Sequence, residues 1–197
     1  MHYKKLLQAA LMLLLLGCKK DPENRKEPPA QMIYTDFTSQ PVLIREGTPA
    51  FELDIDGDGT KDFAFKGQHV QEPEHSYTFI YVDPLTEQAH QQAITTQACA
   101  FTPNASIRLQ IETGSTHYWS NSRGILTETE HFPDRQERDG QFIGAAPGYL
   151  AVKVKRGGNT YLGWIALRHQ VEAGIDRIYI LRAAISKQPD TAVIAGV

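Results

Sequence analysis

The chain has 197 residues, 41% of them hydrophobic, and its 20 Lys and Arg against 23 Asp and Glu give a net charge of -3. Loss of residues 1–17, predicted below, would remove Lys4 and Lys5 and bring the net charge to -5. This acidic balance argues against a nucleic acid partner. The remaining length is sufficient for one domain with a sizeable core, and no second domain is required.

The chain begins with a short basic segment and an apolar run from Leu6 to Leu16 that only Gln8 interrupts. A membrane-spanning helix needs about 20 apolar residues, so this shorter run indicates a secretory signal. Its end, Leu15-Leu16-Gly17-Cys18, resembles the lipobox of bacterial lipoproteins. The resemblance implies a signal peptide over residues 1–17 and a lipid-modified Cys18 that anchors the protein to a membrane. The alternative is an ordinary secreted protein in which Cys18 has no such role.

Residues 19–30, KKDPENRKEPPA, are charged, polar or proline apart from the final alanine. Such a segment cannot bury enough apolar surface to become ordered. Residues 18–30 are therefore predicted to form a lipidated cysteine and a flexible tether. The sequence Cys-Lys-Lys-Asp at 18–21 also resembles export signals of Bacteroidetes lipoproteins, which implies an outer-membrane lipoprotein that faces the cell surface; the alternative is a periplasmic spacer.

Beyond the tether, short runs of β-branched and aromatic residues alternate with turn residues. Strands are predicted at 32–38, 50–55, 62–66, 76–82, 106–112, 149–155, 160–168 and 177–185. This pattern predicts a single all-β domain over residues 31–197, an antiparallel β-sandwich or jelly-roll-like fold. The spacing of Leu85, Ala89 and Ala93 also permits one short helix.

The segment 54–62, DIDGDGTKD, places four carboxylates and two glycines between apolar flanks that favour strands. Calcium takes six to eight oxygen ligands, and alternating carboxylates on a tightly turned backbone can converge on one ion. The segment matches the start of an EF-hand loop, but Phe65 stands where that loop has its bidentate Glu. It resembles instead the DxDGDGxxDF hairpins of FG-GAP-type calcium-loop proteins. We therefore predict a structural calcium site with ligands Asp54, Asp56, Asp58, Thr60 and Asp62; the alternative is a solvated acidic turn.

A second local pattern lies near the end of the chain, where Gly157-Gly158 separates two runs of alternating apolar residues. Glycines supply the positive φ angles of a tight hairpin turn, and the turn fixes the register of the two strands. On the predicted core face, the register pairs Val154 with Tyr161, Val152 with Gly163, and Leu150 with Ile165.

The opposite face of this hairpin carries Leu162 and Trp164 beside lysines. It is therefore either covered by another element or exposes an aromatic ring. An exposed ring would make Trp164, with Tyr149 and Trp119, a candidate platform for a ligand such as a sugar; a packed tryptophan is the alternative.

Motifs of common enzymes are missing, since the sequence has neither a Gly-x-Ser-x-Gly nor a His-Glu-x-x-His pattern. Glu128 and Glu130 would share one face of a strand, as carboxylate pairs do in some glycosidases, but a solvent-facing strand explains them equally well. Cys99 has no partner once Cys18 is lipidated, and we expect it to be a buried apolar residue. The four histidines considered as metal ligands are interpreted as scattered surface residues: His69, His75, His117 and His131.

Taken together, the lipobox, DIDGDGTKDFAF and GYLAVKVKRGGNTYLGWIAL resemble a set of exported bacterial lipoproteins, many from Bacteroidetes. The resemblance covers about residues 32–185 and implies location and a β-sandwich fold without an activity. The leading hypothesis is a surface binding or adhesion module for a glycan or an envelope protein. The alternatives are an accessory envelope lipoprotein without a small ligand and, third, a glycosidase.

Overall fold

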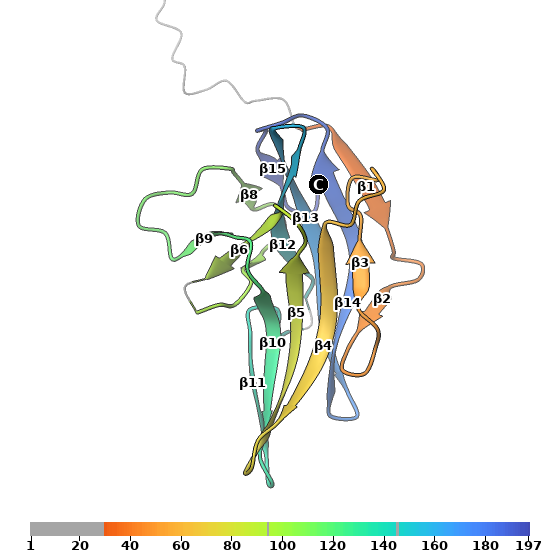
Figure 1. The fold of residues 1–197 in the computed structure, drawn as a ribbon, viewed down its shortest axis with the longest axis vertical. Coiled ribbons are helices and arrows are strands. Elements are labelled where there is room, and N and C mark those ends of the chain that lie inside the picture. Colours follow the sequence, from red (N-terminus) through yellow and green to blue (C-terminus); the bar gives the residue numbers. More distant parts are fainter. Residues whose placement is uncertain (1–29, 94, 145) are drawn as a thin grey trace, which may run out of the picture.

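The computed structural model describes residues 30–93, 95–144 and 146–197. The predicted signal peptide, Cys18 and the tether up to residue 29 lie outside these residues. The described part of the chain is all-β; it contains no helix, and therefore none that is long and apolar enough to cross a membrane. Its sheets are antiparallel and pack together as a β-sandwich (Figure 1), which confirms the predicted fold class.

The larger sheet has eight strands and contains the predicted glycine hairpin. Its main path runs β1 (Met32–Asp36), β14 (Ile175–Ser186), β13 (Asn159–Glu172), β12 (Gly148–Arg156), β6 (Ala89–Ala93) and β9 (His117–Ser120). Two short strands join this path, β2 (Val42–Ile44) beside β14 and β7 (Ala100–Phe101) beside β12. The long strands β12, β13 and β14 thus form the middle of this path, and the short polar strands β6 and β9 form one of its edges.

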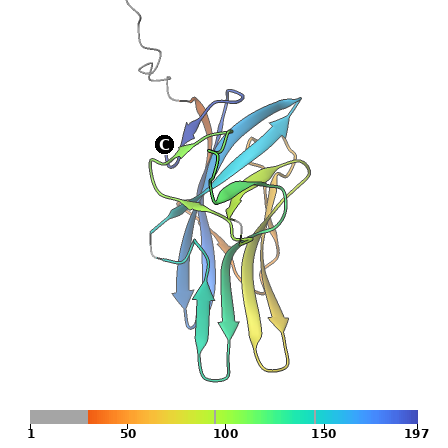
Figure 2. The same cartoon turned by 90° about the vertical axis from the view of Figure 1, so that its left-hand side faces the viewer.

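The second sheet has five strands, in the order β11 (Gln136–Asp139), β10 (Gly124–His131), β5 (Ser76–Pro84), β4 (Phe63–Gln71) and β3 (Phe51–Leu53). Its hairpins β4–β5 and β10–β11 reach the lower end of the molecule in both views (Figures 1 and 2). A separate pair, β8 (Ser106–Ile107) with β15 (Val193–Ile194), lies near the opposite end.

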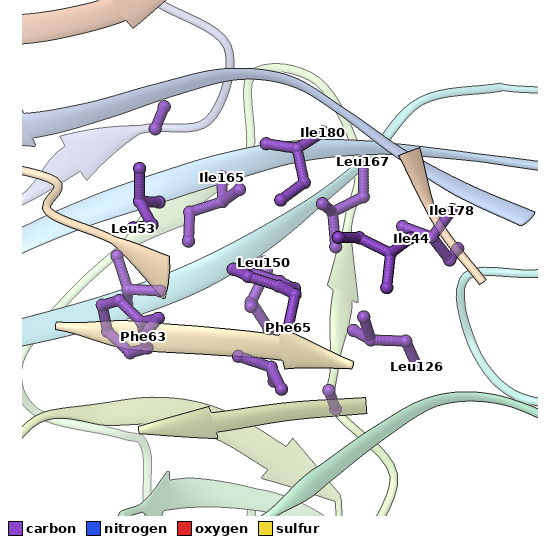
Figure 3. Close-up of a cluster of buried hydrophobic side chains, with 14 of the residues drawn as sticks. Ile44, Leu53, Phe63, Phe65, Leu126, Leu150, Ile165, Leu167, Ile178 and Ile180 are labelled. Atoms are coloured by element: carbon purple, nitrogen blue, oxygen red, sulfur yellow. The ribbon is translucent and has the colours of Figure 1, made fainter. Parts of the chain in front are cut away.

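The main core fills the space between the two large sheets. Figure 3 shows Phe63 and Phe65 of β4 facing Leu150 of β12 and Ile165 of β13, and these four side chains are at most 1% exposed. Because alternate residues of each strand point to the same side, the apolar set of each strand reaches this layer. Burying one such side chain contributes about 1.5–3 kcal/mol.

A second core covers the outer face of the larger sheet. There Leu162 and Trp164 of β13 pack with Ile107 of β8 and Val193 of β15. The Trp164 Nε1 donates a hydrogen bond to the Val197 carbonyl at 3.3 Å. The β8–β15 pair and the chain end thus cover the hairpin face that the sequence left open.

Every predicted pair of the glycine hairpin is present. Val154 pairs with Tyr161, Val152 with Gly163 and Leu150 with Ile165, and Gly157 and Gly158 have φ angles of 57° and 80°. The register prediction is confirmed because a two-residue turn leaves the strands no freedom to slip.

Two other predictions were wrong. The possible helix at 85–93 is a turn followed by strand β6, in which Ala89 pairs with Lys153 of β12; apolar spacing alone did not reveal that both edges of this segment find strand partners. The strand at 106–112 ends at Ile107. Residues 108–116 continue as a loop, whose alternation of apolar residues has no adjacent strand to pair with.

Candidate functional site

The carboxylate loop joins β3 to β4 at a closed hairpin. Leu53 pairs with Phe63, and the Asp62 amide donates to the Leu53 carbonyl at 2.8 Å. Asp62 is only 2% exposed, and its Oδ2 accepts a hydrogen bond from the Ile55 amide at 2.9 Å. Asp62 therefore forms the buried base of the loop.

The other three carboxylates, Asp54, Asp56 and Asp58, accept hydrogen bonds from backbone amides of the loop. Asp54 accepts hydrogen bonds from the amides of Gly57 at 2.7 Å and Gly59 at 2.8 Å. These glycines have φ angles of 75° and 93°, a region that residues with a Cβ rarely adopt. One carboxylate oxygen from each of Asp54, Asp56 and Asp58 lies within 4.8 Å of the others.

The negative charges of the loop carboxylates act on one another's pKa values. Burial is the largest of the causes that raise the pKa of Asp62 to about 6; the charges of Asp54, Asp56 and Asp58 act in the same direction, and the hydrogen bond from the Ile55 amide opposes them. Burial likewise raises the pKa of Asp56, and the charges of Asp58 and Asp54 act in the same direction. A bound cation would favour the ionised form of each carboxylate.

Arg156, at the end of β12, supplies a positive charge to this loop. Its Nη1 lies 2.8 Å from Asp56 Oδ2, and the Asp56 side chain is 4% exposed against 41% for Arg156. The guanidinium carbon also lies 4.7 Å from the centre of the Tyr161 ring. The ion pair therefore links the carboxylate loop of one sheet to the glycine hairpin of the other, and nothing in the sequence indicated it.

The residues of the loop fit a hard divalent cation in part. Calcium prefers carboxylate and carbonyl oxygens, and the cluster of Asp54, Asp56 and Asp58 offers three carboxylates. Among the described residues, Asp62 is outside that cluster of acidic side chains and lies at the base of the loop. Thr60, predicted to bind through its carbonyl oxygen, is exposed, and its amide donates to Asp58 Oδ1 at 2.7 Å. Three of the four predicted carboxylate ligands are thus brought together.

The three predicted platform aromatics meet in the second core rather than on an open surface. Trp164 is 1% exposed, so it offers no ring face to a ligand. Tyr149 packs edge-on against it with ring centres 5.4 Å apart. Trp119 is half-buried, with Nε1 donating to the Leu109 carbonyl at 2.9 Å and the Lys153 ammonium 5.2 Å from its ring centre. The pattern of the strands could not show which element would cover them.

A cavity of about 470 Å³ is lined by the 108–116 loop and by strands of the larger sheet, next to the position of Trp119, which pairs with the lining residue Gln91. In Figure 1 this loop stands out from the larger sheet. Gln91 of β6 and His117 of β9 line it from the sheet, together with Phe101 of β7. Arg108 and Glu112 line it from the loop. This site could not be predicted from the sequence, because its residues belong to segments that are predicted as a helix, as a strand or as no element.

The structure brings together polar residues elsewhere that looked isolated in the sequence. Asp176 is 3% exposed and accepts hydrogen bonds from Thr129 at 2.8 Å and Arg138 at 3.1 Å; its Oδ1 lies 2.7 Å from His169 Nε2. Burial acts to raise the pKa of Asp176, but these hydrogen bonds and the Arg138 charge together lower it. Since Thr129 and Arg138 belong to the smaller sheet and Asp176 to the larger, this cluster ties the two layers together.

Several of the remaining sequence candidates lie on the smaller sheet. Glu128 and Glu130 share β10; burial raises the pKa of Glu128, and Glu130 accepts a hydrogen bond from Tyr77 at 3.1 Å. His131 does not stand alone, because its ring centre lies 6.2 Å from that of His69. Cys99 is 7% exposed, as expected, and burial raises the pKa of its thiol to about 11.

Comparison of the chain with protein-family models, with curated proteins and with solved structures found no match.

Proposed function

We propose that the protein is a lipid-anchored binding module of the bacterial cell envelope, with calcium as a structural ion in the Asp54–Asp62 loop. The single observation that carries the proposal is the convergence of Asp54, Asp56 and Asp58 within 4.8 Å. Repulsion among carboxylates this close would be relieved by a cation. The lipobox at Cys18 supports attachment to a membrane.

The role of the ion is structural. The loop joins two strands, and Asp56 is also tied to Arg156 of the other sheet, so an ion there would hold the end of the sandwich together. Extracellular calcium sites of this kind have dissociation constants of about 10⁻⁴ to 10⁻³ M. At about 2 mM calcium, such a site stabilises the folded state by about 0.5–2 kcal/mol through mass action.

The calcium role is tested by thermal unfolding of the full chain in detergent, in 2 mM calcium and in chelator. We expect calcium to raise the Tm by about 2–7 °C. Asp56→Ala should lower the Tm in calcium and much less in chelator. Asp134→Ala, at a side chain 79% exposed in the β10–β11 turn, is the matched control and should leave the calcium response intact. An equal loss for Asp56→Ala in both buffers would contradict an occupied site.

The binding role is supported by the cavity beside Trp119, which has the size of known small-ligand sites. The test is a binding screen of the full chain against polysaccharides and envelope proteins, in calcium and in chelator. Binding that requires calcium would connect the ion to function through the fold. Absence of any ligand, together with co-purification of a membrane protein assembly, would favour an accessory role instead.

A further inference from the structure

The outer face of the larger sheet is covered only in part. The β8–β15 pair and the chain end cover the second core at the upper end of the molecule (Figure 1). Below this cover, Arg168 of β13 pairs with Tyr179 of β14, and Arg182 of β14 stands opposite Ala166 of the second core. Alternate residues of a strand point to the same side, so all of these lie on the outer face. Together with Tyr34 of β1 they define the arginine–tyrosine face: Tyr34, Arg168, Tyr179 and Arg182.

Both arginines of this face are held against tyrosine rings. The guanidinium carbon of Arg182 lies 4.3 Å from the centre of the Tyr34 ring, and that of Arg168 lies 5.2 Å from the centre of the Tyr179 ring. Such stacking is favourable for a guanidinium group and restricts its orientation. Tyr34 is 44% exposed, so this end of the face is open to solvent. The two cations therefore have defined positions before any partner binds.

Neither arginine has an acidic partner within the described chain. Arg168 and Arg182 take part in none of its ion pairs. In each of them Nε is buried without a hydrogen-bond partner, but neither terminal Nη atom is buried in this way. Since the Nη atoms form no hydrogen bond to other described residues, they keep contact with solvent. A ligand can therefore reach the Nη atoms, although it cannot reach Nε.

The carboxylates near this face are engaged by other groups. Asp36 stands opposite Arg182 in the pairing of β1 with β14, but its Oδ1 accepts hydrogen bonds from the amide of Thr38 at 2.7 Å and from the Thr38 hydroxyl. Glu172, at the end of β13, forms an ion pair with Arg177. The free positive charge of the face is therefore a narrow row that carboxylates flank.

The shape and charge of the row select a narrow acidic chain rather than a broad anionic surface. Diagonal neighbours on paired strands lie about 7–8 Å apart, so Arg168 and Arg182 can contact two anionic groups of one extended ligand. A guanidinium group binds a carboxylate through two parallel N–H···O bonds. A membrane or a nucleic acid would also bring negative charge against Asp36 and Glu172, and the net charge of -3 opposes such a surface further.

We propose that the arginine–tyrosine face binds an acidic polysaccharide, whose uronate carboxylates pair with the Nη atoms of Arg168 and Arg182. The exposed Tyr34 offers a phenol hydroxyl, which can donate to and accept from the hydroxyls that each sugar unit carries. This contact favours a saccharide over an acidic peptide. The inference rests on the proposed binding role, for which it names a ligand class and a surface separate from the cavity.

The test is calorimetric titration of the full chain in detergent at about 50 mM salt, without added calcium, since calcium also binds carboxylates. The probes are oligomers of galacturonate, glucuronate and mannuronate, and their methyl esters as neutral forms of the same chains. Oligoglutamate serves as an acidic chain without sugar, and phosphatidylglycerol vesicles serve as an anionic membrane. We expect at least one acidic oligosaccharide to bind, the methyl esters to fail, and the last two probes to bind at least tenfold more weakly. Binding should weaken at about 0.5 M salt, because exposed charges are then screened.

Four variants locate the site. Arg168→Gln and Arg182→Gln should each weaken binding about tenfold, because each removes one charged pair. Arg182→Lys keeps the charge but not the fork of donors, and should retain more affinity than Arg182→Gln. Lys66→Gln, at an exposed lysine of β4 in the smaller sheet, makes the same change in net charge and is the matched control. The Tm of each variant, measured in the same buffer, shows that the fold is retained.

The possible outcomes separate this inference from the broader proposal. Binding of an acidic oligosaccharide that survives Arg168→Gln combined with Arg182→Gln would overturn this face as the site but leave the binding module in place. Equal binding of oligoglutamate, of the vesicles or of the methyl esters would overturn the acidic saccharide as the ligand. Binding of none of the probes would overturn the inference, whereas the calcium-dependent rise in Tm tests the structural ion independently of any sugar.

Discussion

Strands β12 and β6 lie side by side in the larger sheet, yet they bury opposite kinds of side chains. Val152 of β12 is fully buried and pairs directly with His90 of β6, which is also fully buried. β12 buries apolar residues on both faces, in the main core and in the second core. β6 buries His90, Gln91 and Gln92, and each has at least one side-chain atom without a hydrogen-bond partner among the described residues.

This difference shows that burial alone does not say what a strand contributes. The apolar residues of β12 stabilise the fold at any pH, because their transfer from water involves no titration. The polar residues of β6 lower the stability unless something satisfies them. The apolar strand therefore stabilises the fold at every pH, whereas β6 makes the stability of the fold depend on the protonation of His90.

The largest expected effect is in the second core, where Trp164 of β13 packs with Ala151 of β12. Trp164→Ala should destabilise the protein by about 3–5 kcal/mol, because it empties a site that is 1% exposed. The loss should be the same at pH 7 and at pH 5, as measured by urea unfolding. Tyr118→Ala, at a side chain 44% exposed, is the control and should change stability by no more than about 0.5 kcal/mol. A loss below about 1 kcal/mol for Trp164→Ala would show that the second core contributes little.

The next effect concerns the polar strand and depends on pH. Burial lowers the pKa of His90 to about 4 from its ordinary 6.5, with Asp83 opposing the shift. Between these values the unfolded chain binds a proton that the folded chain does not, so this contribution to stability is complete above pH 6.5 and declines as the pH falls to 4. The decline amounts to about 3 kcal/mol at 1.36 kcal/mol per pKa unit.

The measurement is the free energy of unfolding of the unmodified protein minus that of His90→Leu, from pH 7 to pH 4. The difference is needed because Asp62 also titrates in this range: its pKa is raised to about 6 in the folded state, so its protonation stabilises the folded protein as the pH falls below 6. This effect is the same in the unmodified protein and in His90→Leu, and the subtraction removes it. His69→Gln, at an exposed histidine of β4, should leave the pH dependence unchanged. A difference that stays constant with pH would show that His90 can be protonated in the folded state.

The part of the fold that could be predicted from sequence is the part that local rules determine. Gly157-Gly158 fixes a turn, and the turn fixes which residues of β12 and β13 face one another. The carboxylate spacing of Asp54, Asp56 and Asp58 acts in the same way over a few residues, and these side chains do converge. In both cases the pattern and the structure that it predicts lie in one short segment.

The rest depends on contacts between distant segments. β6 carries Gln and His at positions where a buried strand normally has Val or Ile, so its sequence does not resemble a strand. Trp164 is covered by Val193 and Ile107, from segments far from it in the chain. The cavity lining comes from β6, β7, β9 and a loop, and no single segment carries its pattern.

The smallest expected effect concerns Arg156, whose ion pair with Asp56 connects the glycine hairpin to the carboxylate loop. Its Nη1 lies 2.8 Å from Asp56 Oδ2, while Asp56 Oδ1 accepts a hydrogen bond from the Asp58 amide at 3.2 Å. Arg156→Gln should lower stability by about 0.5–1 kcal/mol in chelator. In 2 mM calcium the loss should be smaller, because the ion takes over the role of the guanidinium at Asp56.

Lys155→Gln, which removes a more exposed contact to Glu87 at 3.5 Å, is the matched control and should have little effect in either buffer. Arg156→Gln combined with Asp56→Asn isolates the energy of the pair in a double-mutant cycle. A coupling energy that is present in chelator and reduced by calcium would place the ion at Asp56. A coupling energy unaffected by calcium would mean that Arg156 alone neutralises this carboxylate. The loop would then need no ion at Asp56, because a side chain of the protein already pairs with it, in contrast to the buried polar atoms of β6.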